Sequence, residues 1–364
     1  MSGALAGLRV IDASTLYAAP YLATLLADHG ADVVKIEQPG GDAYRHHPGR
    51  MWPLLARGKR SVELDLRSEE GCATLRRLVI DADVLVVNLP LATLDKRGID
   101  YSTLSALNPD LIYVSVTGYG QDGPYADRPG NGTIAEAFSG LTHVTGEPDG
   151  PPILPSTPTG DAVTALTGAF GVLAACYHRL AHGGGGQLVD VNPIDSLLQA
   201  VAPIHAEYDG SGDPPARLGS RLRDSMIRNV FPTADGRWVA ISASTSRHFS
   251  EMATLAGHES RDDAGVPVGD VEASLREWTS TRHHTVVIEE LVARRLPVSL
   301  VQTARDIRDD PHVRSRGCLV EVITDEQGAV TVPSPAPRLS DTPATRAIRT
   351  PAFGQHTDEV LGTW

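Results

Sequence analysis

The chain has few cysteines and a deficit of positive charge, and both shortages exclude classes of protein. Its three cysteines, Cys72, Cys176 and Cys318, are far apart and outside any CxxC pairing. The sequence therefore predicts neither a disulfide framework nor a zinc site. Lysine and arginine number 32 against 45 aspartate and glutamate residues, which gives a net charge of −13. This balance disfavours general nucleic-acid binding but leaves room for a local basic pocket that takes a phosphorylated ligand.

Signals for export and membrane insertion are also missing. The stretch 1–7 has no basic segment followed by an apolar one, and no uninterrupted apolar run is long enough to cross a bilayer. A hydrophobic fraction of 41% and a charged fraction of 21% are typical of a soluble globular protein. We therefore expect a cytoplasmic protein whose partners are neither membranes nor nucleic acids.

The first two hundred residues alternate β-branched runs with helical stretches, which predicts an α/β domain on a largely parallel sheet. Several runs are almost continuously apolar, as buried strands are. The expected strands are 8–12, 32–37, 61–65, 84–88, 111–116 and 187–191, and the expected helices are 19–29, 69–81, 101–107 and 161–182. The glycines 183–186 should end the last of these helices.

A second domain is expected because 364 residues exceed the size of most single cores. The turn-rich segment 209–215 is a candidate linker. Beyond it we expect a hairpin over 229–241 that turns at Asp235-Gly236, helices within 249–293, and another hairpin over 319–332.

Gly160-Asp161 begin the longest expected helix. A carboxylate at that position meets free backbone N–H groups and the positive end of the helix dipole, so it stays ionised. Such an acid can serve as a nucleophile whose products are hydrogen-bonded in place. It can also be a simple helix cap, and the local sequence alone favours the cap.

Other motifs give weaker signals. The segment 13–20 contains neither GxGxxG nor GxxxxGK[ST], so a conventional dinucleotide or P-loop site is not expected. The segment 115–125 ends a strand with glycines and polar residues, as sites at the carboxyl edge of α/β sheets do, and as plain loops also do. His178 and His182 share a helix face without a third ligand, and we assign no role to His283-His284. No metal site is predicted.

Ordered motifs over most of the chain resemble the class III CoA-transferases, whose relatives include formyl-CoA transferase, carnitine CoA-transferase and α-methylacyl-CoA racemase. The matching segments are 5–12, 18–20, 26–37, 58–61, 64–66, 82–88, 108–109, 118–125, 139–141, 145–152, 160–161 and 356–361. The resemblance implies a Rossmann-like large domain, 1–205 completed by 333–364, and a smaller α+β domain with linkers over 206–332. It also implies an interlocked homodimer, in which two subunits thread through one another.

The resemblance further implies a chemistry. In that family the aspartate that matches Asp161 attacks an acyl-CoA thioester and gives an aspartyl–acyl anhydride. The released CoA thiolate then forms an enzyme thioester, and an acceptor acid collects the CoA. Coenzyme A is thus expected as an acyl-CoA substrate. Both intermediates remain activated while water is excluded, and backbone N–H groups would stabilise each oxyanion.

A CoA groove is implied as well. Its expected members are Tyr17, Ala18, Gln38, Leu64, Asp65, Arg67, Asn88, Leu89 and Lys96. Lys59, Arg60, Lys96 and Arg97 are candidates for pairing with the CoA phosphates, or else solvated surface residues.

The chain differs from known members of this family at three places. Formyl-CoA transferase has glutamine at the place of Tyr17 and tyrosine-glutamate at the place of Asn131-Gly132, which disfavours formate or oxalate as substrate. The racemases have a histidine at the place of Asn131, and asparagine cannot replace that base. The glycine-rich lid of formyl-CoA transferase is not found between 257 and 270, so water must be excluded in another way.

We therefore expect a CoA-transferase in which Asp161 is the nucleophile. Asn131 is a candidate to hydrogen-bond the thioester or acid, and Tyr17 to line the acyl pocket, although simple packing would also explain either residue. The alternatives are a 2-methylacyl-CoA racemase and a CoA-binding dimer without catalysis.

Overall fold

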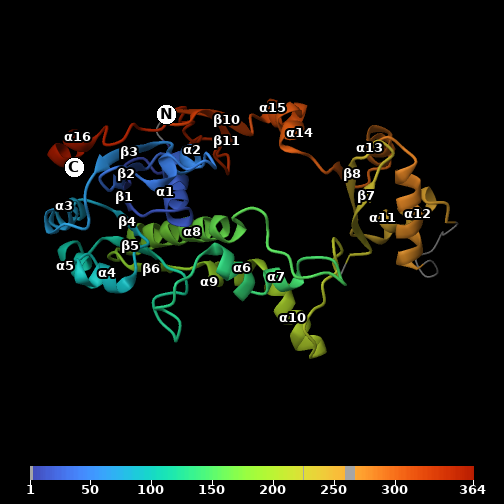
Figure 1. Cartoon of the computed structure of the whole chain (residues 1–364), viewed down its shortest axis with the longest axis horizontal. Helices are drawn as coiled ribbons and strands as arrows, with labels where there is room; N and C mark the ends of the chain where they lie inside the picture. The colour runs from blue at the N-terminus through green and yellow to red at the C-terminus, as the bar shows by residue number, and fades with distance from the viewer. Residues whose placement is uncertain (1–2, 224, 259–266) are drawn as a thin grey trace. The chain divides into compact units, whose positions relative to one another are not determined.

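The computed structural model describes residues 3–223, 225–258 and 267–364. It divides into two compact units, and Figure 1 labels most of their elements. The first unit comprises Met1–Leu141, Leu154–Gly210 and His312–Trp364, and the second comprises Thr142–Ile153 and Ser211–Pro311. The stretch 257–270, where no glycine-rich lid is expected, falls largely on 259–266, which lie outside the described residues.

Six parallel strands form the sheet of the first unit, in the order β3-β2-β1-β4-β5-β6 (Figure 1). Their bounds are β1 Arg9–Ala13, β2 Asp32–Glu37, β3 Lys59–Glu63, β4 Val84–Val87, β5 Ile112–Val116 and β6 Leu188–Val191. This is the Rossmann-type order, in which the winding direction reverses between β1 and β4. The predicted α/β fold with a parallel sheet is confirmed, although β3 begins at Lys59 rather than at residue 61.

Helices cover both faces of this sheet, which is why its strands are apolar on both sides. One face packs against α1 (Ala18–Asp28) and α8 (Thr159–His182), and the other packs against α3 (Glu69–Val79) and α5 (Tyr101–Leu107). Shorter or peripheral helices are η1 Ala43–Arg45, α2 Trp52–Ala56, α4 Leu91–Lys96, α6 Gly132–Phe138, α7 Leu141–Val144, α9 Pro193–Ala200, α10 Ala202–Ser211, α15 Pro311–Arg316 and α16 Thr357–Thr363.

The long helix α8 ends as predicted, at Gly183 in the left-handed conformation with φ 62°. By length and composition it could span a membrane, although Thr164 and Thr167 interrupt its apolar run. Its buried face, however, includes Ala165, Val172 and Ala175 and joins the core shared with α1. The core helices of soluble proteins pass the same test.

The C-terminal part of the chain belongs to the first unit. Strands β10 (Leu319–Thr324) and β11 (Gly328–Pro333) form the predicted hairpin, but its assignment to the small domain is wrong. Val322 and Val332 pack with Leu54 of α2, and α16 lies against β3. A hairpin pattern shows which face is apolar but not which element covers that face, so the sequence alone could not make this assignment.

The second unit is a small α+β fold. Strands β7 (Ile227–Pro232) and β8 (Trp238–Ala243) form the predicted hairpin, with Gly236 in the turn at φ 73°. β9 (Val298–Leu300), which the sequence did not reveal, pairs with β8 as an antiparallel strand at the edge of this sheet. Helices α11 Ser246–Leu255, α12 Val268–Ser280, α13 His284–Ala293 and α14 Ala304–Asp309 complete the described part of the unit.

Candidate active site

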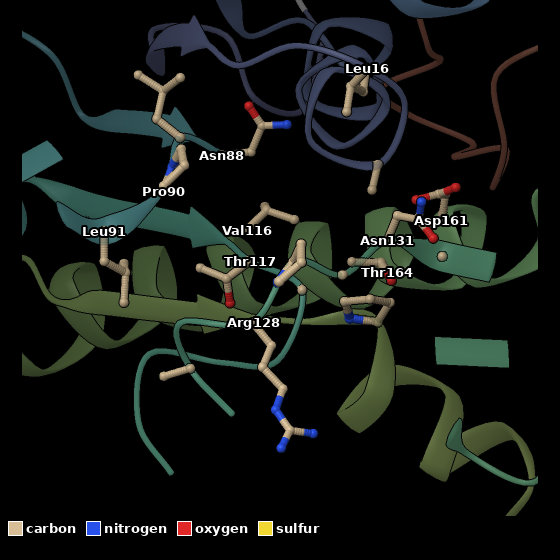
Figure 2. Close-up of a pocket in the computed structure, with 18 of the residues that line it drawn as sticks. Leu16, Asn88, Pro90, Leu91, Val116, Thr117, Arg128, Asn131, Asp161 and Thr164 are labelled. Carbon is tan, nitrogen blue, oxygen red and sulfur yellow. The ribbon is translucent and has the colours of Figure 1, made fainter. Parts of the chain in front are cut away.

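A cavity of about 510 Å³ opens where the winding of the parallel sheet reverses (Figure 2). Its walls come from the segments that follow β1, β4 and β5, from the loop 126–132, and from the first turns of α8 and α9. Ligands of doubly wound sheets bind at this position because the loops diverge at the carboxyl ends of the strands. The cavity contains Asp161 among its lining residues.

The loop after β1 forms one wall in a strained conformation. Leu16 has φ 68°, a left-handed value that leucine rarely adopts, and it is 57% exposed. Asn88 holds the preceding residue through two hydrogen bonds: Thr15 N donates to Asn88 Oδ1 at 2.9 Å, and Asn88 Nδ2 donates to Thr15 O at 2.7 Å. The amide of Asn88 therefore shapes the pocket wall, in addition to lining the cavity.

Asp161 lies in the first turn of α8, where Pro158 provides no side-chain cap. The start of α6 lies directly against its carboxylate. A Cβ atom at Gly132 would be only 2.6 Å from Asp161 Oδ2, so a side chain at position 132 would displace the acid. The missing side chain lets the backbone of Gly132 hydrogen-bond the carboxylate.

The sequence predicts that the start of the helix stabilises the charged form of Asp161, but the surroundings of the carboxylate disfavour that form. Burial and the negative charge of Glu136 raise the pKa of Asp161, and the hydrogen bond from the Gly132 backbone opposes them only in part. The direction is opposite to the effect expected from the helix dipole alone. Burial, Tyr21 and Asp161 similarly raise the pKa of Tyr17 to about 12.

Glu136 is a site residue that the sequence did not reveal. It is 3% exposed, and its Oε1 accepts a hydrogen bond from Gly160 N at 2.8 Å. Gly160 N is one of the free amides at the start of α8, so Glu136 provides the cap that Pro158 cannot. No local signal could have identified it, because a glutamate inside a short helical segment is ordinary.

Asn131 lines the cavity, and Figure 2 draws it at the same end as Asp161. Its Oδ1 accepts a hydrogen bond from Ile134 N at 3.1 Å and caps α6. The side-chain oxygen thus has a structural use, and a ligand would meet the Nδ2 amide instead.

The expected CoA groove divides into two parts. Tyr17, Ala18, Asn88 and Leu89 line the cavity together with Asp161. The remaining candidates, Gln38, Leu64, Asp65, Arg67 and Lys96, are not among the lining residues. Gln38 and Leu64 directly follow β2 and β3, at the same carboxyl edge of the sheet. Asp65 and Arg67 form an exposed ion pair at 2.8 Å.

Of the basic candidates for the CoA phosphates, Lys59 is wrong and Arg60 already has acidic partners. Lys59 is buried and its Nζ lies 2.8 Å from Asp12 Oδ2, while Arg60 pairs with Asp32 and Glu359. Of the residues that line the cavity, Arg128 has the cationic side chain, and sequence reasoning missed it. Its guanidinium lies 3.5 Å from the ring centre of Tyr125, and Figure 2 draws it away from Asp161.

A group of possible metal ligands occurs in the second unit. Ligand atoms of Asp235, His283 and His284 lie within 4.8 Å of one another. His284 Nδ1 is 2.6 Å from Asp235 Oδ2, and His284 N donates to Asp235 Oδ1 at 3.0 Å. These hydrogen bonds hold the β7–β8 turn against the start of α13 and account for the cluster without an ion.

Comparison with known proteins identifies the family of the chain. The model of CoA-transferase family III matches residues 5–357. The chain is 37% identical to the succinyl-CoA–L-malate CoA-transferase beta subunit of Chloroflexus aurantiacus, over 98% of this chain and 93% of that protein. It is 36% identical to the succinyl-CoA:mesaconate CoA-transferase of Haloarcula hispanica, over 99% and 96%.

A solved structure extends the similarity to three dimensions. A CAIB/BAIF family protein from Brucella suis matches with a TM-score of 0.87 and 30% identity, over 99% of both chains. Because the family match, the curated relatives and the fold cover nearly the whole chain, this protein belongs to CoA-transferase family III, whose reaction moves CoA between an acyl-CoA thioester and a carboxylic acid.

Proposed function

We propose that the protein transfers CoA from succinyl-CoA to a dicarboxylic acid, with Asp161 as the covalent nucleophile. The observation that carries the proposal is a carboxylate lining a cavity at the switch point of the sheet, against the backbone of Gly132. The two relatives described above use succinyl-CoA by name, and their acceptors, L-malate and mesaconate, are dicarboxylic acids.

In the proposed reaction an oxygen of Asp161 attacks the thioester carbon, and the C–S bond breaks. CoA leaves as a thiolate, and Asp161 becomes a neutral mixed anhydride. The thiolate then attacks the Asp161 carbonyl, which releases succinate and leaves an aspartyl thioester. The acceptor carboxylate repeats the sequence in reverse, so the thioester is conserved without consuming water.

The lining residues have distinct proposed roles. The Gly132 amide would stabilise an oxyanion at Asp161, whose carboxylate it contacts. Leu16, Leu89 and Val116 give the cavity apolar walls that exclude water. Arg128 is suited to an anionic group of the ligand, since guanidinium pairs well with carboxylate and phosphate.

CoA itself is expected to extend from the cavity along the carboxyl edge of the sheet. Tyr17, Ala18, Asn88 and Leu89 would contact its thiol arm within the cavity. Gln38, Leu64, Asp65 and Arg67 follow β2 and β3 on the same edge and would contact the nucleotide end. The exposed Lys96 at the end of α4 is the proposed partner of a phosphate.

The assembly is proposed to be an interlocked homodimer. An apolar stripe on α8 supports a partner: its members Leu166, Phe170, Leu173, Tyr177 and Leu180 are 44–82% exposed. Their alternating spacing of four and three residues is the heptad pattern of a helix that packs on another helix. The occupant is proposed to be a second copy, as the family resemblance implies.

Light scattering tests the assembly. The wild type should have the mass of a dimer. Phe170→Glu should weaken dimer formation, while Leu107→Glu on α5 should leave it unchanged. Leu107 is 46% exposed but outside the stripe, so it controls for the added charge. A monomeric wild type would contradict the proposed assembly.

The catalytic proposal is tested by turnover and trapping. Succinyl-CoA with L-malate or mesaconate should give the new CoA thioester, and hydroxylamine should convert the acylated enzyme to a hydroxamate on the Asp161 peptide. Exchange of the α-proton into deuterated water without an acceptor acid would instead indicate a racemase. Binding of CoA without turnover over a panel of acids would indicate a non-catalytic protein.

A further inference from the structure

Glu136 is a buried acid with an unusual environment. It is 3% exposed, and within the described part of the chain no lysine or arginine forms an ion pair with it. Its hydrogen bond from Gly160 N joins two segments that are 24 residues apart in the sequence. A buried carboxylate without a cation is costly, so its presence beside the nucleophile points to a functional reason.

The packing around Gly160 couples Glu136 to Asp161. A Cβ atom at Gly160 would lie 2.8 Å from Gly132 O and 3.3 Å from Glu136 Cγ. Gly132 in turn lies against the carboxylate of Asp161. The starts of α6 and α8 therefore form one close contact, and a shift of Glu136 would move the backbone that carries the nucleophile.

We propose that Glu136 is a positioning residue of the transfer reaction: its carboxylate fixes the start of α8 through Gly160, and its negative charge repels the ionised form of Asp161. This inference rests on the proposed function, in which Asp161 is acylated. Acylation moves the negative charge from the carboxylate to the departing sulfur of CoA, so the repulsion is relieved as the anhydride forms. Ground-state repulsion that disappears during the reaction favours the attack.

The other groups that face Asp161 do not supply the opposite charge. Tyr17 precedes α1 and Tyr44 lies in η1, and the charge of Asp161 contributes to raising the pKa of both phenols. Asn131 at the start of α6 is neutral. Glu136 is the charged side chain that contributes to the raised pKa of Asp161, alongside burial.

Glu136→Gln separates the two effects because it keeps an acceptor oxygen for Gly160 N and removes the charge. We expect kcat to fall by about tenfold with the KM for succinyl-CoA nearly unchanged. Without the charge of Glu136 the pKa of Asp161 is lower, so the acidic limb of the pH profile of kcat should move to lower pH. Asp100→Asn is the matched control, since Asp100 caps α5 by accepting from Thr103 N at 3.1 Å.

Glu136→Asp provides the complementary variant if the glutamine variant does not fold. This variant keeps the negative charge but moves the carboxylate oxygen away from Gly160 N. We therefore expect kcat to fall while the acidic limb of the pH profile of kcat stays in place. A glutamine variant with wild-type kcat and pH profile, or an aspartate variant with wild-type kcat, would overturn the role of Glu136. Absence of any label on Asp161 in the wild type would refute the proposed function itself, so the two failures are distinguishable.

Discussion

Asp12, which is buried, and Asp161, which is half-buried, are carboxylates of the same unit with opposite environments. Asp12 in β1 is fully buried, 2.8 Å from Lys59 Nζ and 3.8 Å from Lys35 Nζ. Burial works against its charge, but the two lysines outweigh burial and hold the pKa of Asp12 below its usual range. Asp161 has Glu136 for a neighbour instead, and its pKa is raised. The fold compensates the charge that it needs for structure and leaves uncompensated the charge that is proposed to react.

The two environments have opposite consequences for stability. A depressed folded-state pKa means that Asp12 stabilises the fold above its unfolded pKa, and this contribution is lost as pH falls through the folded value. A raised folded-state pKa means that Asp161 opposes folding increasingly as pH rises above its unfolded pKa of about 3.9. Replacing Asp12 should therefore lower the free energy of unfolding, and replacing Asp161 should raise it.

The largest expected effect is on turnover. Asp161→Ala should lower kcat by about 10⁴-fold or more, because no other described side chain can replace the proposed nucleophile. Circular dichroism should show that the variant remains folded. Activity above about one per cent of wild type would place the nucleophile elsewhere.

Removing the compensated charge should damage the fold. Asp12→Asn leaves Lys35 and Lys59 buried without their shared partner, so the free energy of unfolding should fall by about 3–5 kcal/mol. Urea unfolding measures the loss. Asp32→Asn is the matched control in the neighbouring strand: its partner Arg60 is partly exposed, so the loss should stay below about 1 kcal/mol. Equal losses in both variants would remove the distinction between the two environments.

Removing the uncompensated charge should have the opposite effect. Asp161→Asn should raise the free energy of unfolding at pH 7.5 by about 1 kcal/mol, the size common for substitutions that relieve strain at functional sites. The gain should shrink as pH falls, because wild-type Asp161 then takes up a proton and the repulsion from Glu136 is lost. A gain that is constant with pH would show that charge is not its cause.

The smallest expected effect concerns the strained pocket wall. Leu16→Asn should raise the free energy of unfolding by about 0.5 kcal/mol, because asparagine adopts the left-handed conformation more readily than leucine. Leu107→Asn in helix α5 controls for the loss of an exposed leucine and should not stabilise. A destabilised Leu16→Asn would mean that packing of Leu16 outweighs its backbone strain.

Much of the fold of both units could be predicted because its signals are local. Continuous β-branched runs gave the six strands, and Gly183 gave the end of α8. The β7–β8 turn followed from Asp235-Gly236. The position of Asp161 came from a family motif, since a first-turn aspartate alone favours a cap.

The missed features all depend on contacts between distant segments. Glu136 meets Gly160 only when α6 and α8 pack together, and Lys59 meets Asp12 only across the sheet. The C-terminal hairpin joins the first unit through α2. Charge and hydropathy along the chain do not specify such partners, which is why the sequence cannot exclude Lys59 as a candidate for the CoA phosphates.

Oxygen tracing tests the central claim most directly. Turnover with succinyl-CoA and an acceptor acid labelled with ¹⁸O in its carboxylates should leave ¹⁸O in the side chain of Asp161, because the acceptor's oxygen bridges the second anhydride and stays with the enzyme. Mass spectrometry of the digested protein should find the label on the peptide with Asp161 and on neither the Glu136 nor the Asp12 peptide. Sustained turnover with an unlabelled Asp161 peptide would contradict the account.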